Sequence, residues 1–199
     1  MANATSPFGL IGRHEMYSGP YNSGVRLYSV PASDATAIFP GDLVTEVGTS
    51  QFINGQTFAD VKQSATGDVF TGVCVGVLPV SRDTLPYRAA STQAVIFVED
   101  NPNAVFEIRQ VAGGTPLTAN DIGLNANVVV GSGSTYTGLS GMALDNATEA
   151  TTNTLDLKIV GMVNRADNDP GSAVGTGADS SSFLVRINRH RYANQIAGV

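Results

Sequence analysis

The sequence of 199 residues is poor in cysteine, tryptophan and lysine. Its single cysteine, Cys74, excludes a disulfide framework and a cysteine-ligated metal cluster, and the apolar run around it predicts a small buried side chain. Tryptophan is absent, and lysine occurs only at Lys62 and Lys158. With 11 basic and 17 acidic residues the formal net charge is −6. This balance argues against nucleic acid as the main partner, because phosphate binding relies on Lys and Arg.

Charge of either sign is scarce as well, at 14% of residues against a usual quarter. Hydrophobic residues make up 42%, enough for a sizeable core, so wholesale disorder is not expected. A weakly charged surface is typical of a protein covered by other subunits, and equally of an ordinary turn-rich β-protein. No run of about 18 apolar residues exists, so no membrane span is predicted. The first residues lack the basic start and apolar core of a secretion signal.

Long helical periodicity is missing too, whereas short alternating β-branched runs are frequent. Residues 93–110 contain two such runs around the turn-forming residues 100–103, which predicts a hairpin. The apolar run 70–80 predicts a buried strand that pairs with this hairpin. We expect these three strands to form the centre of the domain. Their predicted core residues are Cys74, Val75, Val77, Val95, Phe97, Phe106 and Ile108.

The remaining strands and turns complete an all-β prediction. Strands are expected at residues 25–30, 36–39, 43–47, 127–130, 141–144, 154–163 and 183–192, with a short hairpin at Asn54-Gly55. One helical turn, capped by Thr118, is expected within residues 116–123. We therefore predict a β-barrel or β-sandwich of short antiparallel strands with at most one short helix. It has an extended N-terminal arm (residues 1–23) and a single β-rich domain (residues 24–199).

The N-terminal arm combines residues that interrupt regular structure with large apolar side chains. Pro7, Gly9, Gly12, Gly19 and Pro20 are expected to prevent a regular element. The apolar residues need cover, either from a neighbouring subunit or from the chain's own barrel. We predict that they form the main partner contact, through Phe8, Leu10, Ile11, Tyr17 and Tyr21.

A second candidate contact lies near the C-terminus. Strand alternation would place Arg186 and His190 on one face, with Arg189 and Arg191 on the other. These residues form either a solvated edge strand, whose charges discourage self-pairing, or a basic strip that faces acidic groups of a neighbour.

Residue patterns for catalysis or metal binding are absent. His14 lacks the second histidine of a zincin helix, and no Gly-x-Ser-x-Gly elbow occurs in a strand-to-helix context. Asp167 and Asp169 resemble the start of a calcium loop, but its Gly and Glu are missing. The sequence therefore predicts a non-enzymatic protein with no cofactor and no metal.

Several segments together resemble the head decoration, or cement, proteins of tailed bacteriophages, which are small virion proteins that accompany the major capsid protein. The segments are residues 20–22, 30–39, 41–44, 87–92, 98–107 and 121–127. The similarity extends from about residue 20 to residue 192, and none of the segments is a mechanistic motif.

The resemblance implies a β-rich protein without enzymatic activity that binds the outside of the shell and stabilises joints between major capsid subunits. Its implied partners are the major capsid protein and further copies of itself, as a dimer or trimer, with no nucleic acid and no membrane. Its implied place is the capsid exterior of the virion, after synthesis in the host cytoplasm. The alternative is a host-recognition or glycan-binding module of the virion, and a small hydrolase is a further rival.

Overall fold

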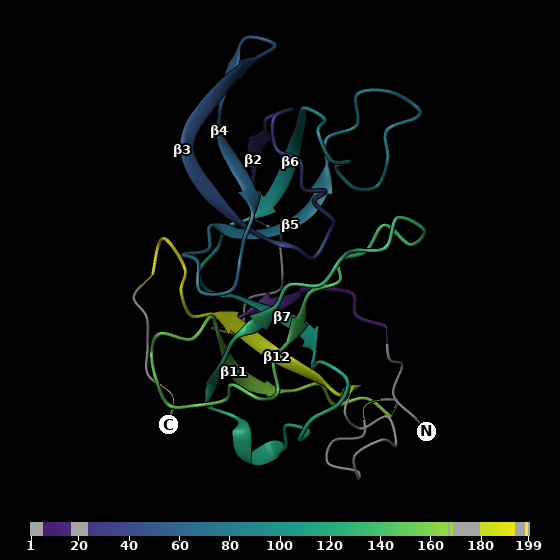
Figure 1. Ribbon diagram of the computed structural model, residues 1–199. Helices are drawn as coiled ribbons and strands as arrows, with labels where there is room; N and C mark the ends of the chain where they lie inside the picture. Colours follow the sequence, from purple (N-terminus) through teal and green to yellow (C-terminus); the bar gives the residue numbers. More distant parts are fainter. Residues whose placement is uncertain (1–5, 17–23, 167, 169–179, 194–197, 199) are drawn as a thin grey trace.

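The computed structural model describes residues 6–16, 24–166, 168, 180–193 and 198, and these residues form an all-β structure. Within them lie twelve strands and one turn of 3₁₀ helix. Nearly every strand pair is antiparallel; the exception is a short parallel contact at Ser29 and Asp60. Figure 1 shows two layers along the chain, a barrel and a sheet beneath it.

The barrel is formed by five strands that close in the order β2-β4-β3-β5-β6. Their bounds are β2 (Val25–Val30), β3 (Leu43–Ile53), β4 (Gln56–Gln63), β5 (Gly72–Val77) and β6 (Ala94–Glu99). The barrel interior is small and filled by branched and aromatic side chains: Tyr28, Val30, Ile38, Val44, Val61, Cys74, Ile96 and Val98. A barrel of this size is a packed core and not a channel.

The second layer is a five-stranded sheet with the order β1-β7-β12-β11-β8. Its strands are β1 (Ile11–Glu15), β7 (Ala104–Arg109), β12 (Ser182–Ile187), β11 (Leu157–Met162) and β8 (Asn125–Ala126). The short pair β9 (Val128–Val129) and β10 (Ala143–Leu144) and the helical turn η1 (Ala119–Asp121) lie in its connections. The main core is continuous with the barrel, because it also contains Leu43, Phe70 and Val73.

The predicted hairpin at residues 93–110 is wrong, although both of its strands exist. β6 pairs with β2 and β5 in the barrel, whereas β7 pairs with β1 and β12 in the sheet. The turn between them carries the chain from one layer to the other. Asn101 stabilises that turn, since its carbonyl accepts from Ala104 N and its side chain from Asn103 N. The expected pairing with residues 70–80 therefore holds for β6 alone.

Burial agrees with the predicted core at four of its seven positions. Cys74, Val95, Phe106 and Ile108 are buried, and Val77 and Phe97 are half-buried. Val75 is exposed, contrary to the prediction. A bulge between Cys74 and Gly76 shifts the register of β5 at this residue, so the side-chain alternation that predicts its burial is interrupted.

Local turn chemistry was predicted more accurately than strand ends. Asn54 and Gly55 both have positive φ and join β3 to β4 in a hairpin. Thr118 caps η1 by accepting from Asn120 N, and Asp121 completes the capping box. Residues 36–39 contribute only a single bridge, between Ile38 and Arg88. Asp167 and Asp169, which resemble the start of a calcium loop in the sequence, lie outside the described residues.

Candidate partner-binding surfaces

The N-terminal segment, residues 6–16, packs along the edge of the sheet. Residues 11–15 form β1, which pairs antiparallel with β7, so the expectation that Pro and Gly prevent a regular element is wrong here. Leu10 donates its N–H to Gly41 O at 2.9 Å, and its side chain, only 2% exposed, lies in the main core. Leu10 is thus a core residue and not a partner contact. Tyr17 and Tyr21 lie outside the described residues.

A close approach fixes this segment against the barrel. Gly9 has φ +74°, and a Cβ there would lie 2.5 Å from both Gly41 O and Ser140 Cβ. Only glycine satisfies both the backbone angle and the space. Gly9, which was expected to interrupt regular structure, therefore allows the N-terminal segment to pack closely against Gly41 and Ser140.

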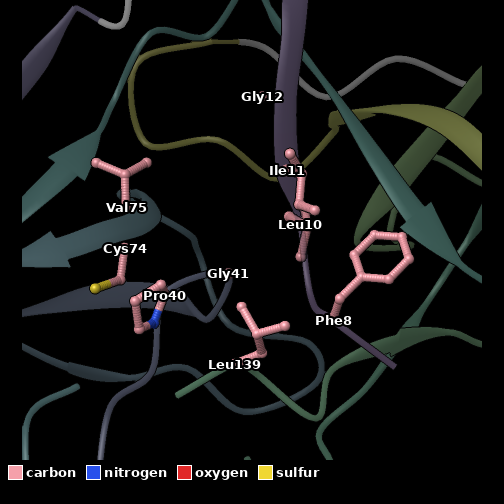
Figure 2. Close-up of a pocket in the computed structure, with 9 residues that line it drawn as sticks. All are labelled: Phe8, Leu10, Ile11, Gly12, Pro40, Gly41, Cys74, Val75 and Leu139. Carbon is pink, nitrogen blue, oxygen red and sulfur yellow. The ribbon is translucent and has the colours of Figure 1, made fainter. Parts of the chain in front are cut away.

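An apolar pocket of about 240 Å³ lies beside this contact (Figure 2). Its walls come from the N-terminal segment, the barrel and the loop before β10, and they include Phe8, Ile11, Pro40, Val75 and Leu139. The Arg109 guanidinium stacks 4.9 Å from the centre of the Phe8 ring and donates to Ser6 O. The pocket therefore has the size and chemistry to receive a small apolar side chain.

No single basic strip is formed by the four candidate residues near the C-terminus, which are Arg186, Arg189, His190 and Arg191. β12 ends at Ile187, because Asn188 N and Arg189 N both donate to Asp156 O, and the predicted alternation fails beyond this point. Arg189 donates to Asp68 O and Thr154 O, and Arg191 forms an ion pair with Glu46 at 3.4 Å. These two arginines connect segments of the chain itself.

His190 is buried rather than available to a partner. It is 3% exposed and forms a parallel bridge with Phe70 of the barrel layer. Its Nδ1 accepts the Tyr192 N–H at 3.1 Å. Burial, opposed by Asp100 and assisted by the Arg186 charge, lowers the pKa of His190 to about 4. His190 is therefore a neutral structural residue at physiological pH.

Arg186 is the C-terminal residue that remains on a surface. It is half-buried in β12, and its side chain points away from the core that Val185 and Ile187 enter. Alternation within β12 accounts for this orientation.

Buried ionisable groups in the described structure serve the fold. Arg88, fully buried, donates to the carbonyls of Pro31, Asp34, Thr36 and Thr92. Asp42 accepts from Phe39 N and Gln63 Nε2, and burial raises its pKa. Among the described residues, no group of three His, Cys, Asp or Glu side chains is arranged to hold a metal ion.

Large apolar side chains are exposed on three projections of the barrel side. Phe52, at the end of the β3–β4 hairpin, is 75% exposed, Val80 in the loop 78–93 is 87% exposed, and Tyr136 in the loop 131–139 is 97% exposed. Residues 47–58 and 131–139 contain no charged residue. We call residues 47–58, 78–93 and 131–139 the projecting loops; Figure 1 shows the first two at the end of the barrel far from the sheet. For these three segments the sequence predicted only the short hairpin at Asn54-Gly55, so the exposure of the apolar side chains was missed.

Comparisons with protein families, curated proteins and solved structures found no match to this chain. In the described part of the chain, no helix has the length and apolar character needed to cross a membrane.

Proposed function

We propose that the chain is a structural virion protein that binds the outer surface of a tailed-phage capsid and stabilises joints between major capsid subunits. Two independent features support the proposal. One is the resemblance of the sequence to phage decoration proteins. The other, which carries the structural argument, is the set of exposed apolar side chains on the projecting loops.

These side chains are well placed for binding and contribute little to folding. Phe52, Val80 and Tyr136 belong to neither hydrophobic core. Each large apolar side chain that becomes buried contributes about 1.5–3 kcal/mol. Two of the three projecting loops, residues 47–58 and 131–139, carry no charged residue and so avoid the cost of desolvating charged groups. This cost is one reason why charged residues are depleted at interface centres. Repetition around a symmetric shell would add avidity.

The test is co-sedimentation of the purified protein with capsids of the encoding phage that lack it. The variant Phe52→Ser/Val80→Ser/Tyr136→Ser is expected to lose binding while it keeps the wild-type melting temperature. Ile122→Ser is the matched control, because Ile122 is also an exposed large apolar residue but follows η1 on the sheet side. Failure of the wild-type protein to sediment with capsids contradicts the proposal, as does unchanged binding by the triple variant.

Glycan binding is the second candidate, and one observation favours it. Tyr136 is an almost fully exposed aromatic residue, and the same loop lines a pocket of about 350 Å³ whose mixed lining includes Thr36, Gln63, Ser132 and Thr135. Exposed rings beside hydroxyl and amide groups suit a sugar. A glycan array with wild-type protein and Tyr136→Ala distinguishes the candidates, since binding that depends on Tyr136 in the absence of capsids supports this second function.

A further inference from the structure

The turn of the β3–β4 hairpin consists of Asn54 and Gly55, the one Asn-Gly pair in the sequence. Ile53 and Gln56, on either side, pair across the two strands, and the two turn residues have φ angles of +49° and +84°. Both turn residues are exposed, and Figure 1 shows the turn at the end of the barrel far from the sheet. A Cβ at Gly55 would meet no atom within 4 Å. The backbone of this turn is therefore open to solvent.

This pair of residues contains the atoms for a spontaneous rearrangement of its own backbone. Asparagine is thermally labile, because the backbone nitrogen of the next residue can attack its side-chain amide carbon. A Cβ on that next residue hinders the attack, and glycine has none. Gly55 N forms a bond to Asn54 Cγ, the Cγ–Nδ2 bond breaks, and the amide nitrogen leaves as ammonia with the proton of the Gly55 N–H. The product is a cyclic succinimide.

Water then opens the succinimide ring at one of its two carbonyl carbons. Attack at Cγ breaks the new Cγ–N bond and leaves aspartate in an unchanged backbone. Attack at the backbone carbonyl carbon of residue 54 leaves Gly55 N bonded to Cγ, which is an isoaspartate linkage. Either route consumes one water molecule and releases one ammonia, so no oxidant, reductant or cofactor takes part.

Hydrogen bonds in the described part of the structure do not oppose this reaction. Neither the Asn54 side chain nor the Gly55 N–H has a hydrogen-bond partner there. Asn120 provides a contrast within the same molecule. It is also exposed, but the nitrogen that follows it, Asp121 N, donates to Thr118 O at 3.2 Å. The fold therefore leaves Asn54 more open to the attack than Asn120.

The geometry of the turn does not itself require asparagine. Asp-Gly and Gly-Gly also fit a two-residue turn with positive φ at both positions. Aspartate would place a charge on the hairpin, whereas residues 47–58 carry none. Asparagine thus keeps the tip of the hairpin uncharged, but it introduces a labile amide.

We propose that Asn54 is a site of spontaneous deamidation in the folded protein, which converts the uncharged tip of the hairpin into a charged one. Both products carry a carboxylate two residues from Phe52, whose side chain is 75% exposed. Isoaspartate also lengthens the backbone between Ile53 and Gln56 by one carbon, and the length of a hairpin turn fixes the strand register. A weaker contact of this hairpin with capsids is the expected consequence. That consequence rests on the proposed function, whereas the reaction itself does not.

The experiment follows the mass of one peptide while the purified full-length protein is incubated at mildly alkaline pH. Trypsin cleaves after Arg26 and Lys62 and releases residues 27–62, in which Asn54 is the only asparagine. Relative to the sample at time zero, mass spectrometry should show this peptide converting to its aspartate and isoaspartate forms before Asn120 converts. Asn54→Gly is the matched control, because it keeps a turn of suitable geometry, and its peptide should gain no mass.

Circular dichroism of the same samples shows whether the protein is folded while the reaction proceeds. The inference is overturned if the peptide 27–62 keeps its mass, or if Asn120 converts as fast as Asn54. It is also overturned if conversion begins only after the spectrum of the folded protein is lost.

Co-sedimentation with capsids then tests the consequence for binding. The aged wild-type protein should lose binding in proportion to the fraction converted, fresh Asn54→Asp should bind weakly without ageing, and aged Asn54→Gly should bind as before. Unchanged binding by both the aged wild type and Asn54→Asp contradicts the expected consequence. Failure of the fresh wild-type protein to sediment contradicts the proposed function alone, because the peptide measurement uses no capsids and decides the deamidation by itself.

Discussion

Replacement of His190 by asparagine should remove the part of the pH dependence of the unfolding free energy that this histidine causes. In the native structure the imidazole is buried and neutral, and its pKa falls from 6.5 to about 4. The causes are loss of solvation, followed by opposing effects of Asp100 and Arg186. Asparagine keeps an oxygen acceptor near the position of Nδ1, so the hydrogen bond from Tyr192 N is retained while the titrating group is lost.

The direction of this pH dependence follows from which state, folded or unfolded, binds the proton at the higher pH. The unfolded chain protonates His190 near pH 6.5, whereas the folded chain does so near pH 4. Its stabilising contribution is therefore complete above 6.5 and is lost as the pH falls to about 4. A displacement of this size corresponds to about 3 kcal/mol of unfolding free energy.

Two buried carboxyl groups act in the opposite direction. Burial raises the pKa of Asp42 and of Asp156. Each binds a proton more readily in the folded state, so each makes the protein relatively more stable as the pH falls through its raised pKa. The total stability curve therefore mixes both signs. The difference between wild type and His190→Asn isolates the histidine.

Urea unfolding of both proteins between about pH 7.5 and pH 4.5 provides the measurement. The wild type should lose stability relative to His190→Asn as the pH falls, with most of the change below about pH 6.5. The variant also leaves a small cavity, which lowers its stability by an amount independent of pH. A difference that stays constant within about 0.5 kcal/mol across this range would falsify the burial argument.

Three further predictions address packing. Gly72→Ala places a Cβ 2.1 Å from Glu99 O, so the free energy of unfolding should fall by about 1–3 kcal/mol or more. In the control Gly76→Ala the new Cβ lies 3.9 Å from its nearest neighbour, so the free energy of unfolding should fall by less. Equal urea midpoints of the two variants would contradict this prediction. Ile108→Ala removes a fully buried side chain and should lower the free energy of unfolding by about 2–5 kcal/mol, measured by circular dichroism in urea. Cys74 is buried and its pKa is raised to about 12, so a thiol reagent should modify it only after unfolding, and rapid modification of the native protein would show that the barrel opens.

Several strands were predictable because alternation and turn chemistry are local. A run rich in β-branched residues coincides with each of the strands β2, β6, β7 and β11. The turn at Asn54-Gly55 is specified by the positive φ angles of these two residues. Pairing was not predictable to the same degree. β6 and β7 are buried on both faces, so their patterns do not indicate which strand is the neighbour.

Burial of the candidate site residues depends on contacts distant in sequence. Leu10 is buried because Gly9 allows the segment to approach Gly41, and His190 because the chain returns to Phe70. Glu107 likewise forms ion pairs with both Arg13 and Arg165, although no spacing rule connects these residues. The orientation of Arg186, by contrast, follows from strand alternation within β12.

The segment that follows β12 connects the two layers. After β12 the chain returns to the barrel, where Arg189 O accepts from Phe70 N at 2.9 Å and Arg191 N donates to Phe70 O at 2.8 Å. Tyr192 Oη then donates to Glu46 of β3.

Together with the shared core, these contacts join the barrel to the sheet. A protein proposed to stabilise joints between subunits benefits from layers held in a fixed relation, because a flexible connection would lose conformational entropy when it is ordered on binding. The sheet therefore supports the barrel that carries the β3–β4 hairpin and the loop 78–93.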